Sequence, residues 1–177
     1  MEFQELFFDR RSIRKYTDKP IDAHLVKSVL TAAMYAPSAV NRQPWHFVVL
    51  DSREMLERTM EIHPHAGMLS TANLAVVVCG DLDLQHDDGY WVPDCGAATQ
   101  NLLMAAHFHG LGACWVGLHP REGRKESMAR LLGLPGHVKP FALVAMGYPA
   151  ERKSRPQRFH PEKVKRNHWG QDYYPAT

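Results

Sequence analysis

The apolar segment NLAVVVCG, at residues 73–80, constrains the fold of this chain more than any other feature. It is of strand length and lacks the polar alternation of a half-exposed strand, so it predicts a central strand covered on both faces. FALVAMGYP at 141–149 predicts a second core strand, and HFVVL at 46–50 and ACWVG at 113–117 predict two more. The chain must therefore supply helices to both faces of a sheet.

Helical periodicity and capping residues supply those helices. Four helices are expected. The first begins at the N-cap Asp22 and ends before Pro37, and the second begins at a capping box of Asp51 and Glu54. The third covers 94–109, and the fourth lies between Pro120 and Gly133. The segment 94–109 is small or apolar around most of its circumference, so it is expected to be buried on more than one side.

The order of these elements limits the fold class. Strands and helices alternate without regular βαβ punctuation, and the sequence has neither GxGxxG nor a Walker motif, which disfavours Rossmann and P-loop folds. A length of 177 residues with 45% hydrophobic content suits a single domain over 1–177. Beyond Pro149 the composition turns polar and basic, which predicts an extended C-terminal arm over 150–177.

Composition excludes several classes of function. With 21 Lys and Arg against 19 Asp and Glu, the chain is too balanced for a general nucleic-acid or membrane binder. No apolar run approaches the roughly 20 residues of a membrane span, and the acidic N-terminal residues do not match a signal peptide. The three cysteines form no CxxC motif, so we expect a reducing, cytoplasmic setting. We expect no metal, because the His63 and His65 pair lacks a third ligand by spacing.

Two short basic clusters stand at the two ends of the predicted domain. FFDRRSIRKY covers 7–16 and ERKSRPQRF covers 151–159, and each mixes cations with a serine. Arginine forks and a serine hydroxyl together suit a phosphate dianion, on which both clusters could converge. The alternatives are a solvated charged face for the first cluster and a disordered basic tail for the second.

Four motifs in register, RRSIRKY, APSAVNRQPWHFVVL, GLGACWVG and MGYPAERKSRPQRF, resemble the nitroreductase family of flavin-dependent oxidoreductases across nearly the whole chain. The resemblance implies an α+β fold of three layers (an α/β sandwich), with a mixed, mostly antiparallel sheet flanked by helices. It also implies an intertwined homodimer with FMN at the subunit interface. In that dimer we expect the helix 94–109 to form the twofold interface and the tail HWGQDYYPAT to wrap the partner.

The resemblance implies cofactor-binding residues position by position. The FMN phosphate and ribityl chain would be held by Arg10, Arg11, Ser12 and Arg14, with Lys153 and Arg155 closing on the phosphate and Arg158 as a further candidate. The flavin ring would be approached from the neighbouring subunit by Pro37, Ser38, Ala39 and Asn41, and on the strand end by Trp115, Val116 and Gly117.

The chain departs from the family pattern before the strand 73–80. Larger members carry a polar Asn and Lys there, whereas this chain has HPHAGML, so His63 or His65 is a candidate replacement and the position could also have none. Tyr90 and Trp91, on a Gly-containing loop, are candidates for bordering the substrate, with packing of the loop onto the domain as the alternative.

The resemblance implies that the flavin N5 carries hydride and that no side chain is a catalytic residue. NADH or NADPH would reduce FMN in a ping-pong cycle, and a flat acceptor such as a nitroaromatic or quinone would reoxidise it. The alternatives are a flavoprotein of the same fold with another donor or acceptor (enone reduction or reductive dehalogenation), a flavin carrier or sensor, and a small nucleic-acid-binding domain.

Overall fold

A computed structural model describes residues 1–174 of the chain. Its helices and strands follow in the order α1 (Phe3–Phe8), α2 (Ala23–Met34), β1 (Trp45–Leu50), α3 (Arg53–Ile62), β2 (Leu74–Asp81), α4 (Trp91–Phe108), β3 (Gly112–Gly117), α5 (Glu122–Leu132) and β4 (Val138–Gly147). Short 3₁₀ turns lie at Ala39–Asn41, Gly67–Ser70 and Pro161–Lys163.

The four strands form one sheet in the order β1-β2-β4-β3, and all three pairs of neighbouring strands are antiparallel. The two longest apolar segments of the sequence, β2 and β4, occupy the centre, as their lack of alternation predicts. A single parallel bridge within residues 1–174, between Ser12 and Ala113, joins the N-terminal segment to β3. The expected mixed, mostly antiparallel sheet therefore consists of antiparallel strands with one parallel bridge at its edge.

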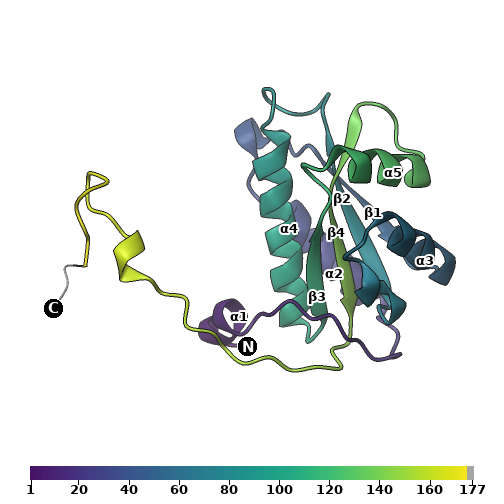
Figure 1. Cartoon of the computed structure of the whole chain (residues 1–177), viewed down its shortest axis with the longest axis horizontal. Coiled ribbons are helices and arrows are strands. Elements are labelled where there is room, and N and C mark those ends of the chain that lie inside the picture. The colour runs from purple at the N-terminus through teal and green to yellow at the C-terminus, as the bar shows by residue number, and fades with distance from the viewer. Residues whose placement is uncertain (175–177) are drawn as a thin grey trace.

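Helices cover both faces of this sheet and give it three layers (Figure 1). Side chains of β2 alternate between two cores: Val76 and Val78 pack with α2 and α4, whereas Ala75 and Val77 pack on the opposite face. Leu56 of α3 and Met128 of α5 belong to that second core. The α+β three-layer architecture is confirmed.

Two helix starts differ from the sequence expectation. The cap of α3 is Ser52, whose Oγ accepts a hydrogen bond from the Met55 N–H at 3.3 Å, rather than Asp51. The helix expected over 94–109 begins earlier, at Trp91, whose ring is buried against β2. A Cβ on Gly80 of β2 would lie 2.3 Å from that ring, so only glycine permits the contact.

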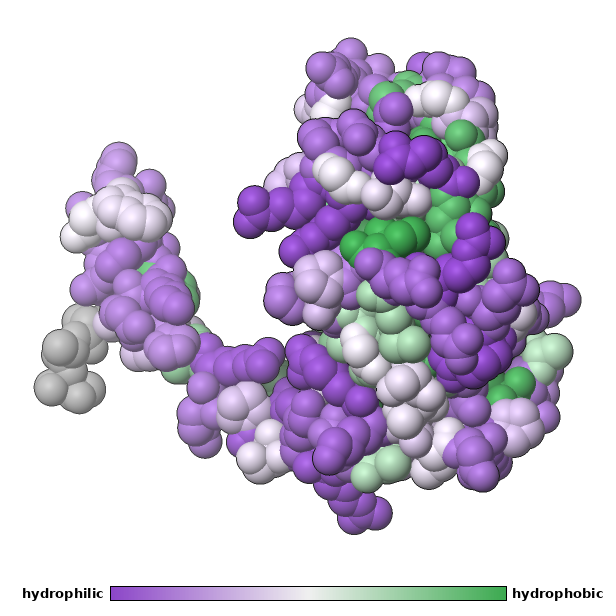
Figure 2. All heavy atoms as spheres, turned by 45° about the vertical axis from the view of Figure 1, so that its right-hand side comes forward, coloured by the Kyte–Doolittle hydropathy of each residue, from purple (hydrophilic) through white to green (hydrophobic). Residues whose placement is uncertain are grey.

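The C-terminal arm leaves the body after β4 and extends away from it (Figure 1). Its surface is mainly hydrophilic in Figure 2, although Phe159 and Trp169 are largely exposed. Between residues 150 and 174 the described structure consists of irregular chain with the 3₁₀ turn Pro161–Lys163 and an isolated bridge between Lys165 and Asp172, and residues 175–177 lie outside the described part. Within residues 1–174, no helix is both long and apolar enough to cross a membrane.

Candidate functional site

The first basic cluster is held against the edge of the sheet beside the start of β3. The N–H of Ile13 donates to the Ala113 carbonyl at 3.1 Å, which continues the Ser12 bridge to the same residue. Gly112 makes this approach possible, because a Cβ there would lie 2.7 Å from Cγ2 of Ile13. The segment Arg10–Arg14 is therefore fixed by backbone pairing rather than left as a mobile charged face.

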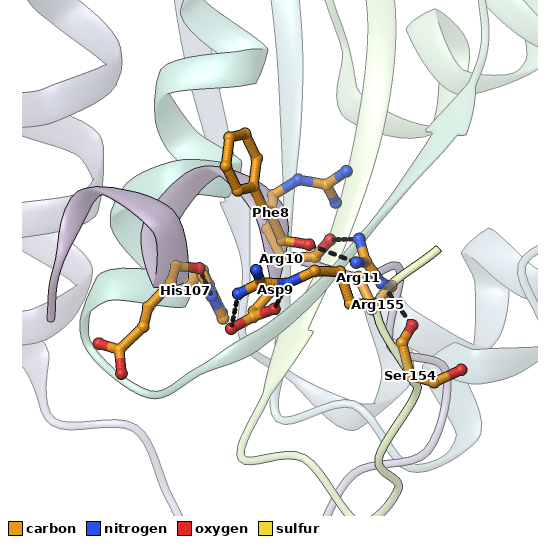
Figure 3. A network of polar contacts seen from close by, with 8 residues as sticks. Phe8, Asp9, Arg10, Arg11, His107, Ser154 and Arg155 are labelled. Atoms are coloured by element: carbon orange, nitrogen blue, oxygen red, sulfur yellow. Dashed lines mark hydrogen bonds and ion pairs between the residues drawn. The ribbon is translucent and has the colours of Figure 1, made fainter. Parts of the chain in front are cut away.

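The structure brings the two basic clusters together (Figure 3). Nε of Arg11 donates to the Ser154 carbonyl at 3.0 Å, and Nζ of Lys153 donates to the Ser12 carbonyl at 2.7 Å. Arg155 donates twice to the Asp9 carboxylate, at 2.6 and 2.9 Å. The start of the arm thus lies on the N-terminal segment, as the sequence argument for convergence requires.

The charges at this junction are unequally neutralised. Both neighbouring acids are engaged, Asp9 with Arg155 and Glu151 with the Arg14 N–H at 2.5 Å and with Lys153 at 3.3 Å. Within residues 1–174 the guanidinium of Arg10 has neither a hydrogen bond nor an ion pair, and no dashed contact reaches it in Figure 3. Burial, and then the charges of Arg11 and Arg158, lower the pKa of Arg10. An anion placed here would relieve that repulsion.

A cavity of about 490 Å³ opens beside these cations. We call it the basic hollow; its lining includes Arg10, Arg11, Gly112, Arg152 and Lys153. The hydroxyl-bearing Ser12 lies between the lining residues Arg11 and Ile13. The volume of the basic hollow and the positive charges in its lining suit a phosphate-bearing ligand.

A second cavity, of about 310 Å³, lies at the far end of β3. We call it the strand-end hollow; its lining is Arg14, His63, His65, Met68, Cys114, Trp115, Val116, Gly117, His119, Pro120, Arg121 and Arg124. The three strand-end residues predicted from the sequence, Trp115 to Gly117, therefore share one cavity with Arg14 of the first cluster.

His63 supports the strand end from behind. Its ring is buried, its Nε2–H donates to the Gly117 carbonyl at 3.0 Å, and its Nδ1 accepts the His65 N–H at 3.1 Å. These two bonds fix a neutral tautomer. Burial lowers the pKa of His63, the bond to Gly117 opposes this, and the charges of Arg124 and His65 lower it further. His63 thus orients the peptide of Gly117.

Cys114 is buried in the floor of this hollow, and burial raises the pKa of its thiol. A protonated, buried thiol is a poor nucleophile, which agrees with its expected role as a bystander. The neighbouring Trp115 is 37% exposed, and its ring packs edge-on against Phe141.

The segment Pro37–Asn41 does not meet the basic clusters within one chain. The N–H of Ala39 donates to the Asp94 carboxylate at 3.0 Å, which places the segment at the N-terminal end of α4. The basic hollow is lined by Leu103 and His107, at the C-terminal end of the same helix. Within one chain, the segment and the basic hollow therefore lie at opposite ends of α4.

Tyr90 and Trp91 line neither of the two hollows. Trp91 is not a loop residue as expected: it is the first residue of α4, 7% exposed, with its ring against His119 and Phe141. Tyr90 is half-exposed and contacts the His86 ring. In one chain, packing explains Trp91 better than a substrate contact does.

Three basic lining residues of the strand-end hollow were missed from the sequence: His119, Arg121 and Arg124. The stretch HPREGRK, directly after β3, carries the signal, since basic residues that follow a strand end and open a helix gather at that edge of the sheet. By its capping pattern alone, this stretch predicts only the start of a helix.

Comparison with known proteins identifies the fold and the family. The profile of the nitroreductase family matches residues 8–80 and 63–148. A protein of Methanothermobacter thermautotrophicus, described as an NADH dehydrogenase/NAD(P)H nitroreductase, is 45% identical over 169 residues, which cover 96% of this chain and 88% of that protein.

Solved structures agree. A protein of Parabacteroides distasonis with the same description superposes with a TM-score of 0.89 at 36% identity, covering 93% of this chain and 97% of that one. A protein of Desulfovibrio desulfuricans described as a nitroreductase, solved in complex with FMN, has a TM-score of 0.81 at 28% identity and covers 93% of this chain and 95% of that one. This chain belongs to the nitroreductase family of oxidoreductases.

Proposed function

We propose that this chain is an FMN-dependent oxidoreductase that uses NADH or NADPH to reduce a flat acceptor such as a nitroaromatic or a quinone. The observation that carries the proposal is the junction of the two basic clusters, at which the guanidinium of Arg10 lines a cavity and has no partner among residues 1–174. The FMN complex of the Desulfovibrio relative and the NAD(P)H nitroreductase description of the Methanothermobacter relative support it.

The residues present fit a flavin that carries a phosphate. Arg10, Arg11 and Lys153 provide donors and positive charge at the basic hollow, whose two neighbouring acids are already paired. Arg155 is less available than expected, because its guanidinium donates two hydrogen bonds to the Asp9 carboxylate. Arg14 connects this region to the strand-end hollow, where Trp115 to Gly117 would face the ring.

When bound, FMN supplies the hydride chemistry, accepting two electrons from a nicotinamide and passing them to the acceptor. The chain's own residues bind and orient. His63 holds the Gly117 peptide in one orientation, and Arg14 places a positive charge at the same hollow, which favours negative charge that develops there. No side chain has to act as a nucleophile, and the thiol of Cys114, which lines this hollow, is buried.

We propose that the active form is a homodimer built on α4. This helix carries no charged residue from Cys95 to Ala106, yet Ala97, Gln100, Met104 and Phe108 lie on one half-exposed to exposed stripe. A twofold axis across α4 would exchange its two ends, so Pro37–Asn41 of one protomer would reach the basic-cluster end of its partner. The dimer would thereby complete a site that one chain leaves open.

The experiment is an anaerobic initial-rate study of the FMN-loaded protein with NADH or NADPH and with menadione or nitrofurazone as acceptor. We expect parallel double-reciprocal lines, because donor and acceptor would react in turn at one site. Loaded, folded protein that oxidises neither nicotinamide in the presence of either acceptor would contradict the proposal.

A further inference from the structure

One wall of the strand-end hollow carries positive charge that the flavin phosphate does not account for. Arg121 and Arg124, in the first turn of α5, line it together with His65. Within residues 1–174 these three side chains make neither an ion pair nor a hydrogen bond, and the lining of the hollow includes no acid. Glu122, the acid of the same turn, is bonded to Lys125 at 2.7 Å and lies outside the lining.

The charges of this wall, from the two guanidiniums and the N-terminus of α5, are all positive. Arg121 is the N-cap of α5 and makes no capping bond, so the positive end of an 11-residue helix adds to the guanidinium charges. The charge of Arg124 reaches the interior of the hollow, because it helps to lower the pKa of His63. Two guanidiniums without a protein partner in one concave wall form a suitable site for a planar carboxylate or a phosphate.

This wall is distinct from the phosphate site at the other end of β3. Arg10, Arg11 and Lys153 line the basic hollow, whereas Arg121 and Arg124 line the strand-end hollow and are not part of the basic hollow. Phosphate-binding groups for FMN are already present around Arg10. A second anionic group is therefore expected at the strand end, where the substrates would meet the flavin ring.

We propose that Arg121 and Arg124, assisted by His65, bind an anionic group carried by a substrate, either a carboxylate on the acceptor or the 2′-phosphate of NADPH. This inference rests on the proposed function, because it assigns charge to the substrates of that site. The shared chemistry is recognition of a carboxylate or phosphate by paired guanidinium donors.

The first test measures binding without turnover. Dissociation constants of the FMN-loaded protein would be measured by calorimetry for benzoate against benzamide and for NADP⁺ against NAD⁺. The variants are Arg121→Gln, Arg124→Gln and the double variant, and the matched control is Arg130→Gln at the other end of α5. We expect the wild type to prefer the anionic member of at least one pair about tenfold or more, since hydrogen bonds to charged groups are strong.

The double variant should lose that preference and the Arg130→Gln variant should keep it. A preference within the first pair alone assigns the group to the acceptor, and a preference within the second pair alone assigns it to the donor. A wild type without preference in either pair would overturn the proposal, as would a folded double variant that keeps it. Loss of FMN from a folded double variant would also overturn it, because the two arginines would then serve the cofactor.

The second test measures turnover with the matched acceptors 4-nitrobenzoate and 4-nitrobenzamide, and with NADPH and NADH. We expect the double variant to lower kcat/KM for the anionic member of the preferred pair at least tenfold more than for its neutral counterpart. If benzoate or NADP⁺ is bound through the arginines while no substrate turns over, the proposed function fails and the anion site stands. If the double variant turns over substrates with the same discrimination between anionic and neutral members as the wild type, the proposed function stands and the anion site fails.

Discussion

Arg10 is a half-buried cation of the basic junction whose guanidinium has neither a hydrogen bond nor an ion pair among residues 1–174. Burial and the charges of Arg11 and Arg158 lower its pKa, so the charged guanidinium is destabilised when no anion is bound. The neighbouring acids Asp9 and Glu151 do not neutralise this charge, because they already bind Arg155, Lys153 and the Arg14 N–H.

Replacement of Arg10 should therefore weaken cofactor binding more than folding. For Arg10→Gln we expect the dissociation constant of FMN to rise about 10- to 100-fold, the value of a hydrogen bond to a charged group. Fluorescence titration of the apoprotein with FMN measures it. Arg58→Gln, on an exposed pair with Glu54 in α3, is the control and should change it less than about twofold. Equal affinities for Arg10→Gln and wild type would refute the assignment.

His63 gives the chain a specific pH dependence. Its pKa in the folded chain lies below the usual 6.5, whereas in the unfolded chain it is normal. Between these two values the unfolded chain binds a proton that the folded chain does not. The free energy of unfolding should therefore decrease as the pH falls through about 6.5, by at most about 1.4 kcal/mol per pH unit from this group.

The measurement is urea unfolding of wild type and His63→Gln between pH 7.5 and 5.5. The variant is less stable at neutral pH but should show a shallower loss on acidification, because it lacks the titrating ring. Other groups, including His119, whose pKa is also lowered by burial, contribute equally to both proteins. Identical pH slopes would show that His63 titrates normally in the folded chain.

At the scale of elements, β3 depends on one small residue. A Cβ on Gly112 would lie 2.7 Å from Ile13, so Gly112→Ala must push the N-terminal segment off the sheet edge. We expect a loss of about 1–3 kcal/mol of stability, as for other overpacked positions, together with weaker FMN binding. Gly123→Ala in α5, where a Cβ meets no atom within 4 Å, is the control and should be neutral or slightly stabilising. Denaturant melts and FMN titrations compare the two variants, and a Gly112→Ala protein as stable as wild type would contradict the packing.

Element positions show how far the sequence could be interpreted. The run at 73–80 had to be a central strand, because a continuous apolar segment needs cover on both faces. The sequence pattern placed Trp91 in a loop. The fold instead packs the Trp91 ring against Gly80, in space that a side chain at position 80 would occupy, and this contact between distant residues has no signal in the local sequence. The basic composition of the two clusters was enough to predict that Arg10 and Lys153 lie near each other. That Arg121 and Arg124 share a cavity with His65 depends on the position of α5 beside the end of β3, which the sequence does not show.

At the scale of the whole molecule, the uncharged stripe of α4 and the separation of Pro37–Asn41 from the basic clusters are the two observations that support the proposed dimer. Light scattering should give about twice the chain mass of 20.1 kDa. Ala97→Glu, which places a charge in the middle of the stripe, should shift the protein toward monomer and lower its FMN content. Ala23→Glu, at the exposed first turn of α2, should leave both unchanged. A wild type that remains monomeric at micromolar concentration would contradict the dimer.

The central claim is that the junction of the two basic clusters holds FMN and that a nicotinamide reduces it there. The most direct measurement is the absorbance spectrum of the purified, FMN-reconstituted and desalted protein, followed by anaerobic titration with NADH and then NADPH. We predict visible flavin bands at about one FMN per chain, which bleach on addition of at least one of the two nicotinamides. A folded protein that retains no flavin after reconstitution, or whose flavin bands survive both nicotinamides, would contradict the account.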